Sequence, residues 1–120
     1  MKIAFTTSGE SLDAPLDSRF GRAPRFLVFN TDDDSFVMVD NTQNLKAAQG
    51  AGIQSAMNAV RAGANAVVSG HCGPKAFRVL NEAGLKIYTS NAASVVEALA
   101  RFRAGELAET TSPDVEGHWI

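Results

Sequence analysis

The sequence contains a single cysteine and only two histidines among its 120 residues. One cysteine cannot form an intrachain disulfide, which is typical of proteins in a reducing compartment, so we expect a cytoplasmic location. The same scarcity excludes a four-cysteine zinc or iron–sulfur site within one chain. An inorganic cluster bound by this protein would therefore bring its own ligands or be shared between subunits.

Long apolar runs and an excess of basic residues are also absent. No stretch approaches the roughly 18 apolar residues that span a bilayer, and the start MKIAFTTSG lacks the cleavage site of a secretory signal. A formal net charge of −2 does not give the basic footprint of a general nucleic-acid binder. We therefore expect neither a membrane nor a nucleic acid as a partner, and any basic site has to be local.

The residues that are present predict one α/β domain followed by a tail. Strand-like segments occupy residues 2–7, 25–31, 35–40, 66–69 and 86–89. Helices are expected from Gly50, where Ile53, Ala56, Met57, Val60 and Ala64 fall at helical spacing, and over about residues 74–83 and 94–104. The domain covers residues 1–105, and the acidic segment 106–120, with Pro113 and Gly117, is expected to be mobile.

The order of these elements predicts a three-layer fold around a mixed five-stranded sheet. Consecutive strands usually lie side by side and parallel crossovers are right-handed, which gives the strand order 3-2-1-4-5 with strand two antiparallel. Four strands then point the same way, and ligands of open α/β sheets bind outside the carboxyl ends of strands. The segments expected to meet there are residues 8–24, 41–52, 70–74 and 90–93.

Several residues in these loops suit an anion. Arg19 and Arg22 carry guanidinium groups that fit bidentate anions, and Gly21 between them lets the backbone approach a ligand. Gly52 stands at the start of a helix, where unpaired amides attract anions. An equally good alternative is that the arginines pair with acids of the same loop, Asp13 and Asp17, on a solvated surface.

The stretch VVSGHCGPKAFRVL leaves further alternatives open. Cys72 and Arg78 satisfy the spacing H-C-x5-R, which resembles cysteine-dependent phosphatases, whose thiolate attacks phosphorus at a helix start. Pro74 removes one amide from such a cradle, and Val79 stands where a hydroxyl residue is usual. His71 and Cys72 also offer soft ligands to an ion such as Cu(I), although two ligands do not close a site.

Four segments together resemble the dinitrogenase iron-molybdenum cofactor biosynthesis family, which includes NifX-type carriers and the C-terminal domain of NifB-type proteins. They read MKIAFTTSG, DSRFGRAPRFLVF, GAGIQSAMNAV and VVSGHCGPKAFRVL, and the resemblance covers about residues 1–105. It implies a ribonuclease H-like topology and a carrier or scaffold for metal–sulfur clusters. Within the family the chain most resembles stand-alone members of sulfate-reducing bacteria, which carry a molybdenum–copper sulfide cluster.

A thiomolybdate-type cluster is a polyanion whose sulfides already ligate its metals, so a protein with one cysteine can hold it with amides, cationic side chains and apolar contacts. We expect His71 to be the direct metal contact. The candidate pocket consists of Arg19, Gly21, Arg22, Lys46, Gly50, Gly52, His71, Cys72, Gly73 and Lys75.

Three functions follow from the sequence. The first is a non-catalytic carrier of an anionic metal–sulfur cluster, either molybdenum–copper sulfide or a cluster like the iron–molybdenum cofactor, in a monomer or weak homodimer. The second is a cysteine phosphatase built on Cys72 and Arg78. The third is an interaction module for a MinD-like ATPase, a partner that the resemblance implies. A two-metal nuclease is excluded, because the strands KIAFTT and AVVS carry no carboxylates to hold the ions.

Overall fold

A five-stranded mixed sheet forms the centre of the protein, and the computed structural model describes residues 1–42 and 51–111. Its strand order, β3-β2-β1-β4-β5, is the predicted one. The antiparallel position of β2 between β3 and β1 and the parallel pairing of β1, β4 and β5 are confirmed as well. The strands are β1 (Lys2–Thr7), β2 (Arg25–Asn30), β3 (Ser35–Asp40), β4 (Ala66–Ser69) and β5 (Lys86–Thr89).

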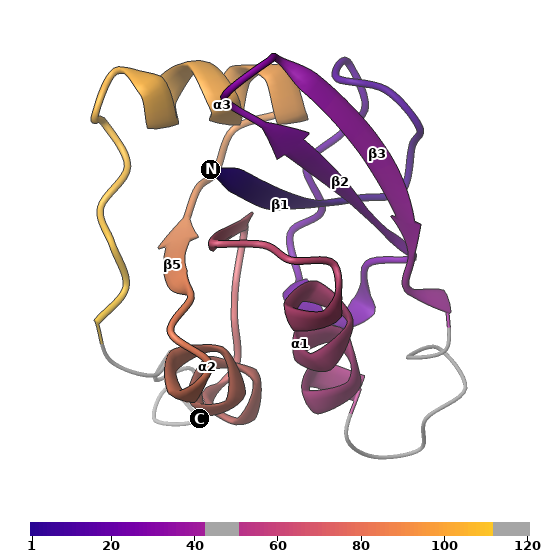
Figure 1. Cartoon of the computed structure of the whole chain (residues 1–120), viewed down its shortest axis with the longest axis vertical. Helices are drawn as coiled ribbons and strands as arrows, with labels where there is room; N and C mark the ends of the chain where they lie inside the picture. Colours follow the sequence, from indigo (N-terminus) through magenta and orange to yellow (C-terminus); the bar gives the residue numbers. More distant parts are fainter. Residues whose placement is uncertain (43–50, 112–120) are drawn as a thin grey trace.

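Helices cover both faces of this sheet, which gives the predicted three layers (Figure 1). Helix α3 (Val95–Arg103) lies on one face, whereas α1 (Ala51–Arg61) and α2 (Pro74–Glu82) lie side by side on the other. Adjacent residues of the central strand feed the two cores: Ile3 and Phe5 pack toward α3, and Ala4 packs toward α1 and α2. This alternation explains why β1 reads as a nearly continuous apolar run.

Local signals set the helix ends close to the predicted positions. Pro74 occupies the first turn of α2 after Gly73, as expected for a residue that needs no amide donor there. Ser94 caps α3 by accepting a hydrogen bond from the Glu97 amide at 3.2 Å. None of the helices among the described residues has the length and apolar character to cross a membrane.

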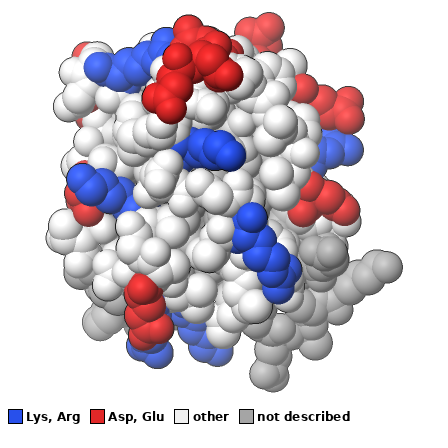
Figure 2. Space-filling model, in the orientation of Figure 1, with Lys and Arg blue, Asp and Glu red and all other residues white. Residues whose placement is uncertain are grey.

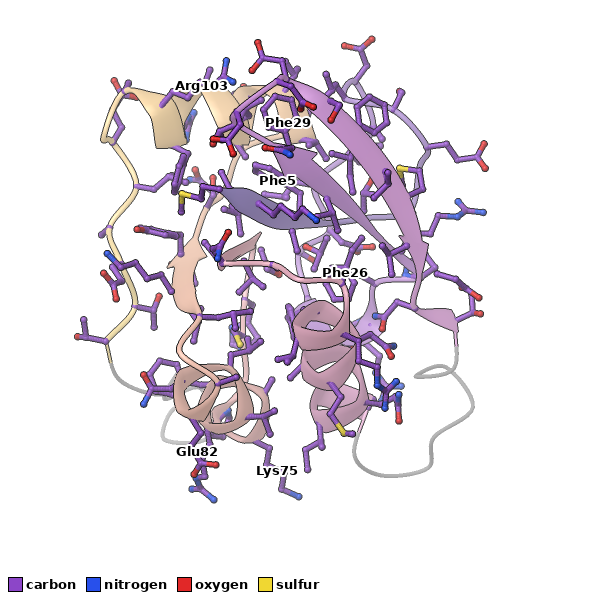
Figure 3. All side chains as sticks on the ribbon, in the orientation of Figure 1. Phe5, Phe26, Phe29, Lys75, Glu82 and Arg103 are labelled. Carbon is purple, nitrogen blue, oxygen red and sulfur yellow. The ribbon has the colours of Figure 1, made fainter. Side chains whose placement is uncertain are left out.

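The turn between β2 and β3 is acidic, and its carboxylates form hydrogen bonds and ion pairs at the surface, as expected for a solvated hairpin tip. The Asp33 carboxylate accepts hydrogen bonds from the amide and hydroxyl of Ser35, and these bonds lower its pKa. Asp34 pairs with Arg103 at 2.6 Å, and the guanidinium of Arg103 lies over the Phe29 ring (Figure 3). Figure 2 shows acidic side chains gathered over this turn, at the top of the view.

The helical spacing that predicts α1 does not identify its buried face. Ala56 is buried, but Ile53, Met57 and Val60 are exposed. The helix instead turns Ser55 and Asn58 inward. The physical reason is a buried polar network with Asn41, described below, that periodicity within one segment cannot reveal.

The segment predicted as a tail begins with contacts to the fold. The Thr110 amide donates to the carbonyl of Ile87 at 2.6 Å, Glu109 bridges Tyr88, and Leu107 packs against the core beneath α3. Ordered packing therefore extends past residue 105. Residues 112–120 of the predicted tail lie outside the described residues.

Candidate functional site

The first long loop is bonded to the carboxyl ends of β1 and β4. The Asp17 amide donates to the Thr6 carbonyl at 2.8 Å, and its carbonyl accepts from the Gly70 amide at 3.1 Å. The Phe20 amide donates to the His71 carbonyl at 2.8 Å, just before the short helix η1 (Phe20–Arg22) turns. Residues from opposite halves of the sequence therefore meet at the predicted edge of the sheet.

A cavity of about 480 Å³, which we call the loop cavity, lies where this loop meets the starts of α1 and α2. It brings together most of the candidate residues. Its lining consists of Arg19, Phe20, Gly21, Arg22, Ala51, Gly52, His71, Gly73, Pro74, Lys75 and Ala76.

The electrostatics of the loop cavity favour an anion. Arg19, Arg22 and Lys75 supply positive charge, and none of the described residues that line the cavity is acidic. The first turn of α2 also contains no acidic residue and opens into the cavity, so the positive end of its dipole faces the same space. Lys75 lies on the rim, because its side chain extends from α2 away from the sheet (Figure 3).

Close backbone packing requires glycine at Gly21, which lines the loop cavity, and at Gly70, which precedes its lining residue His71. A Cβ atom on Gly21 would lie 3.2 Å from the backbone of Gly52, so η1 and α1 can approach this closely only without it. A Cβ atom on Gly70 would lie 2.6 Å from the Ser18 Cα atom, and backbone atoms cannot move aside at low cost. These two glycines therefore allow the loops to pack together.

Cys72 and Arg78 are not brought together. Cys72 is 1% exposed, packs in the core beneath α1 and α2, and is not among the lining residues of the loop cavity. Its Sγ atom lies 3.8 Å from the Gly73 carbonyl oxygen. Arg78 is exposed on α2. A cysteine phosphatase needs both groups on one bound oxyanion, and this arrangement does not provide that geometry.

His71 lines the loop cavity as a half-buried residue whose Nε2 atom is shielded from solvent. Among the described lining residues it is the single imidazole. Among residues 1–42 and 51–111, no group of three His, Cys, Asp or Glu side chains could hold a metal ion. Lys46 and Gly50 lie outside the described residues.

The alternative of arginines neutralised by acids of their own loop is not what the described residues show. Arg25 pairs with Glu10 at 3.9 Å, whereas neither Arg19 nor Arg22 forms an ion pair with Asp13 or Asp17 in the described part of the chain. Burial raises the pKa of Asp17, and a hydrogen bond from the Ser18 amide and the charge of Arg19 act in the opposite direction.

A second cavity, of about 540 Å³, shares the same sheet edge on the side of α3. It uses Ser90 and Asn91 from the fourth predicted loop together with residues after α3. Arg101, the one cation among its described lining residues, already bonds Asn91 at 3.0 Å and Glu97 at 3.2 Å, and Glu106 also lines the space. This charge balance makes it a weaker anion site than the loop cavity.

Sequence reasoning missed the apolar part of the loop cavity. Phe20, Ala51, Pro74 and Ala76 line it beside the expected residues. Phe20, Ala51 and Pro74 are sequence neighbours of Gly21, Gly52 and Gly73, which is the signal that could have identified them, whereas nothing in the sequence marks Ala76.

The fold and the cavity define a small three-layer α/β domain whose loops build a cationic, glycine-lined site at the carboxyl edge of its sheet. The chain belongs to the dinitrogenase iron-molybdenum cofactor family, whose model matches residues 1–105. This assignment confirms the resemblance found in the sequence.

Three relatives give the scale of the similarity. The apo form of the orange protein from Desulfovibrio gigas is 35% identical, with 94% of this chain and 95% of that chain covered and a TM-score of 0.91. A provisionally named NifB protein from Thermotoga is 30% identical over 96% of this chain and 97% of that chain, with a TM-score of 0.83. An uncharacterized protein of Methanocaldococcus jannaschii is 28% identical over 110 residues, 89% of each chain.

Proposed function

We propose that this protein is a non-catalytic carrier that holds an anionic metal–sulfur cluster in the loop cavity. The observation that carries the proposal is the convergence of Arg19, Arg22 and Lys75 on one cavity into which the start of α2 also opens. Guanidinium groups and helix-terminal amides bind anions without displacing ligands from a metal. A cluster whose metals are already ligated by sulfide needs only these contacts and no further metal ligands from the protein.

The particular cargo that we propose is a molybdenum–copper sulfide cluster, with a cluster like the iron–molybdenum cofactor as the second choice. Membership of a family named for the iron–molybdenum cofactor supports a cargo of this chemical class. The 35% identity with the orange protein, a member of the stand-alone type that the sequence most resembles, supports the molybdenum–copper form.

Each part of the lining has a proposed role. Arg19 and Arg22 neutralise the cluster from one wall, and Lys75 does so from the rim. His71 is the proposed direct metal contact, and Phe20 adds an apolar wall. Lys46 and Gly50 remain proposed members of the site, whereas we assign Cys72 to the core and leave it out of cargo binding.

The remaining assignments are also proposals. We propose that residues 1–105 form the family domain, since the family model matches this range, and that residues 106–120 form an appendage to it. A MinD-like ATPase is the proposed partner protein, and the chain is proposed to work in the cytoplasm as a monomer or weak homodimer.

Reconstitution of the full chain tests the proposed cargo. Tetrathiomolybdate and Cu(I) are added to the purified protein, and gel filtration then separates bound metal from free metal. We expect molybdenum and copper to elute with the protein in a saturable ratio, together with visible absorption that tetrathiomolybdate alone does not give. Elution of both metals only at low molecular mass would contradict the proposal.

A further inference from the structure

Helix α1 exposes its large apolar side chains and buries polar ones. Ile53, Met57 and Val60 are 37%, 41% and 37% exposed, whereas Ser55 and Asn58 are buried. A surface helix ordinarily shows the opposite distribution. The three exposed residues are spaced by four and then three positions, so they form a single stripe along the helix. We call Ile53, Met57 and Val60 the α1 stripe.

A buried hydrogen-bond network fixes this orientation of α1. The Nδ2 atom of Asn41, a fully buried residue, donates to the Ala23 carbonyl at 2.8 Å and to the Ser55 hydroxyl at 3.0 Å. The Nδ2 atom of Asn58 donates to the side-chain Oδ1 atom of Asn41 at 2.6 Å. Rotating α1 to bury the stripe would break these bonds and leave amides without partners, at a cost of about 1–3 kcal/mol for each group. Exposure of the stripe is therefore built into the fold.

The surface around the α1 stripe is basic, although the whole chain has a net charge of −2. Arg61 lies at the end of the stripe, and Lys75 and Arg78 are exposed on α2, which packs beside α1. Glu82 is the single acid in the two helices as described, and it is the last residue of α2, one turn after Arg78. Figure 2 shows basic groups on the lower edge of the molecule, where these helices lie, with one acidic side chain beside them.

We propose that the α1 stripe and its basic border form a docking surface for an acidic amphipathic helix of a partner protein. An apolar stripe with this spacing is what a helix needs to pack its own i, i+3 and i+4 side chains against another helix. The basic border, formed by Arg61, Lys75 and Arg78, favours a partner helix whose apolar stripe is flanked by acidic residues.

A second copy of the chain is a poorer occupant. A two-fold axis that lies in the interface and runs across α1 toward α2 would place the basic residues of the two α2 helices against each other, and an axis along the stripe would place Arg61 beside its copy. Like charges at an interface are repulsive. The docking surface also adjoins the loop cavity, because Ile53 follows Gly52, one of its lining residues. A helix docked on the stripe would thus lie beside the mouth of the cavity. This inference goes beyond the proposed cargo and holds for the protein without it.

Peptide titration of the cluster-free full chain tests the docking surface. The probe is a synthetic helix-forming peptide with leucines at i, i+4 and i+7 flanked by glutamates, and its counterpart carries lysines in place of the glutamates. Binding is followed by NMR amide shifts of the labelled protein. We expect saturable shifts in α1 and in the first turns of α2, and affinity at least about tenfold higher for the acidic peptide, equivalent to about 1.4 kcal/mol.

Matched variants connect the result to the stripe. Met57→Ser with Val60→Ser should lower the affinity at least about tenfold. Val37→Ser with Val96→Ser changes two exposed valines elsewhere, which are 61% and 41% exposed, and should leave it unchanged. These substitutions are at exposed positions, so both proteins should fold.

Four outcomes would overturn the inference: no saturable binding, equal binding of the basic peptide, shifts confined to another surface such as β3, or a dimer that Met57→Ser with Val60→Ser dissociates. Preference for anionic phospholipid vesicles over the acidic peptide would overturn it too. Because no cluster is present, none of these results bears on the proposed cargo, and failure of metal reconstitution leaves the docking result standing.

Discussion

At the scale of single residues, Arg19 and Arg22 are the side chains on which cargo binding depends most directly. Arg19 immediately precedes η1 and Arg22 is its last residue, and the hydrogen bond from the Phe20 amide to the His71 carbonyl holds η1 beside the loop after β4. Charge-assisted hydrogen bonds to an anion contribute about 1.5–3 kcal/mol each. They are also sensitive to ionic strength where solvent reaches them.

Replacing both arginines should therefore weaken retention of the cluster. For Arg19→Ala with Arg22→Ala we expect affinity for the tetrathiomolybdate–Cu(I) product to fall at least about tenfold, or 1.4 kcal/mol, with the largest difference at low salt. The control, Lys86→Ala with Arg101→Ala, removes the same charge away from the loop cavity. Equal losses in the two double variants would mean that net charge, and not the cavity, holds the guest.

Cys72 is predicted to matter for stability and not for cargo. Its thiol is buried in the core shared with Phe20 and Phe77, so Cys72→Ser places a hydroxyl in apolar surroundings. We expect a loss of about 1–3 kcal/mol in the free energy of unfolding, measured by urea denaturation, with metal stoichiometry unchanged. Complete loss of bound metal from a folded Cys72→Ser protein would show that the thiolate is a ligand.

At the scale of elements, the rotation of α1 is the feature that organises one wall of the cavity. The Asn41 network sets which residues of α1 face inward, and Gly52 then meets the backbone of Gly21 at the cavity. The amide of Asn41 also donates to the Pro24 carbonyl at 2.8 Å. Asn41 thus connects three parts of the fold: the end of β3, the segment that follows η1, and helix α1.

A double-mutant cycle tests this coupling. Asn41→Ala should lower the free energy of unfolding by about 1–3 kcal/mol, because it removes the hydrogen bonds that Asn41 makes with the buried side chains of Asn58 and Ser55. Asn58→Ala should show a coupling energy with Asn41→Ala of more than about 0.5 kcal/mol. Asn81→Ala, at an exposed position of α2, provides the control for the substitution itself. Additive losses from Asn41→Ala and Asn58→Ala would contradict the network.

Elements differ in how far the sequence predicts them. The strands β1 and β4 are buried on both faces, so their apolar runs identify them without ambiguity. The orientation of α1 could not be predicted, because periodicity assumes that apolar residues point inward. Its true determinant, Asn41, is ten residues before the helix in the sequence, and a polar residue there gives no local sign of a buried role.

At the scale of the whole molecule, strand direction places the site. Once β1, β3, β4 and β5 point the same way, their following loops meet at one edge, and simple connection rules predict this from the sequence. These rules do not determine how the loops at this edge are distributed between separate cavities. Gly70 stands beside the boundary, since it lines the second cavity and the next residue, His71, lines the loop cavity.

That division matters because the described parts of these loops line two separate cavities. Arg19, Arg22 and Lys75 serve the loop cavity, whereas Asn91 and Arg101 serve the cavity beside α3. Charge patterns along a sequence cannot separate two such sites. From the sequence, Arg101 is as good a candidate for binding an anion as Arg19, and only the structure shows that Arg101 bonds Glu97 and Asn91.

The most direct test of the account is to map the bound cluster by NMR. Mo(VI) and Cu(I) are diamagnetic, so amide signals of the labelled full chain remain visible when tetrathiomolybdate and Cu(I) are added. We predict the largest shifts at residues 19–22, Gly52, His71, Gly73, Lys75 and Ala76, around the loop cavity. Largest shifts at Ser90, Asn91 and Arg101, or shifts spread over the whole surface, would contradict the claim that this cavity holds the cluster.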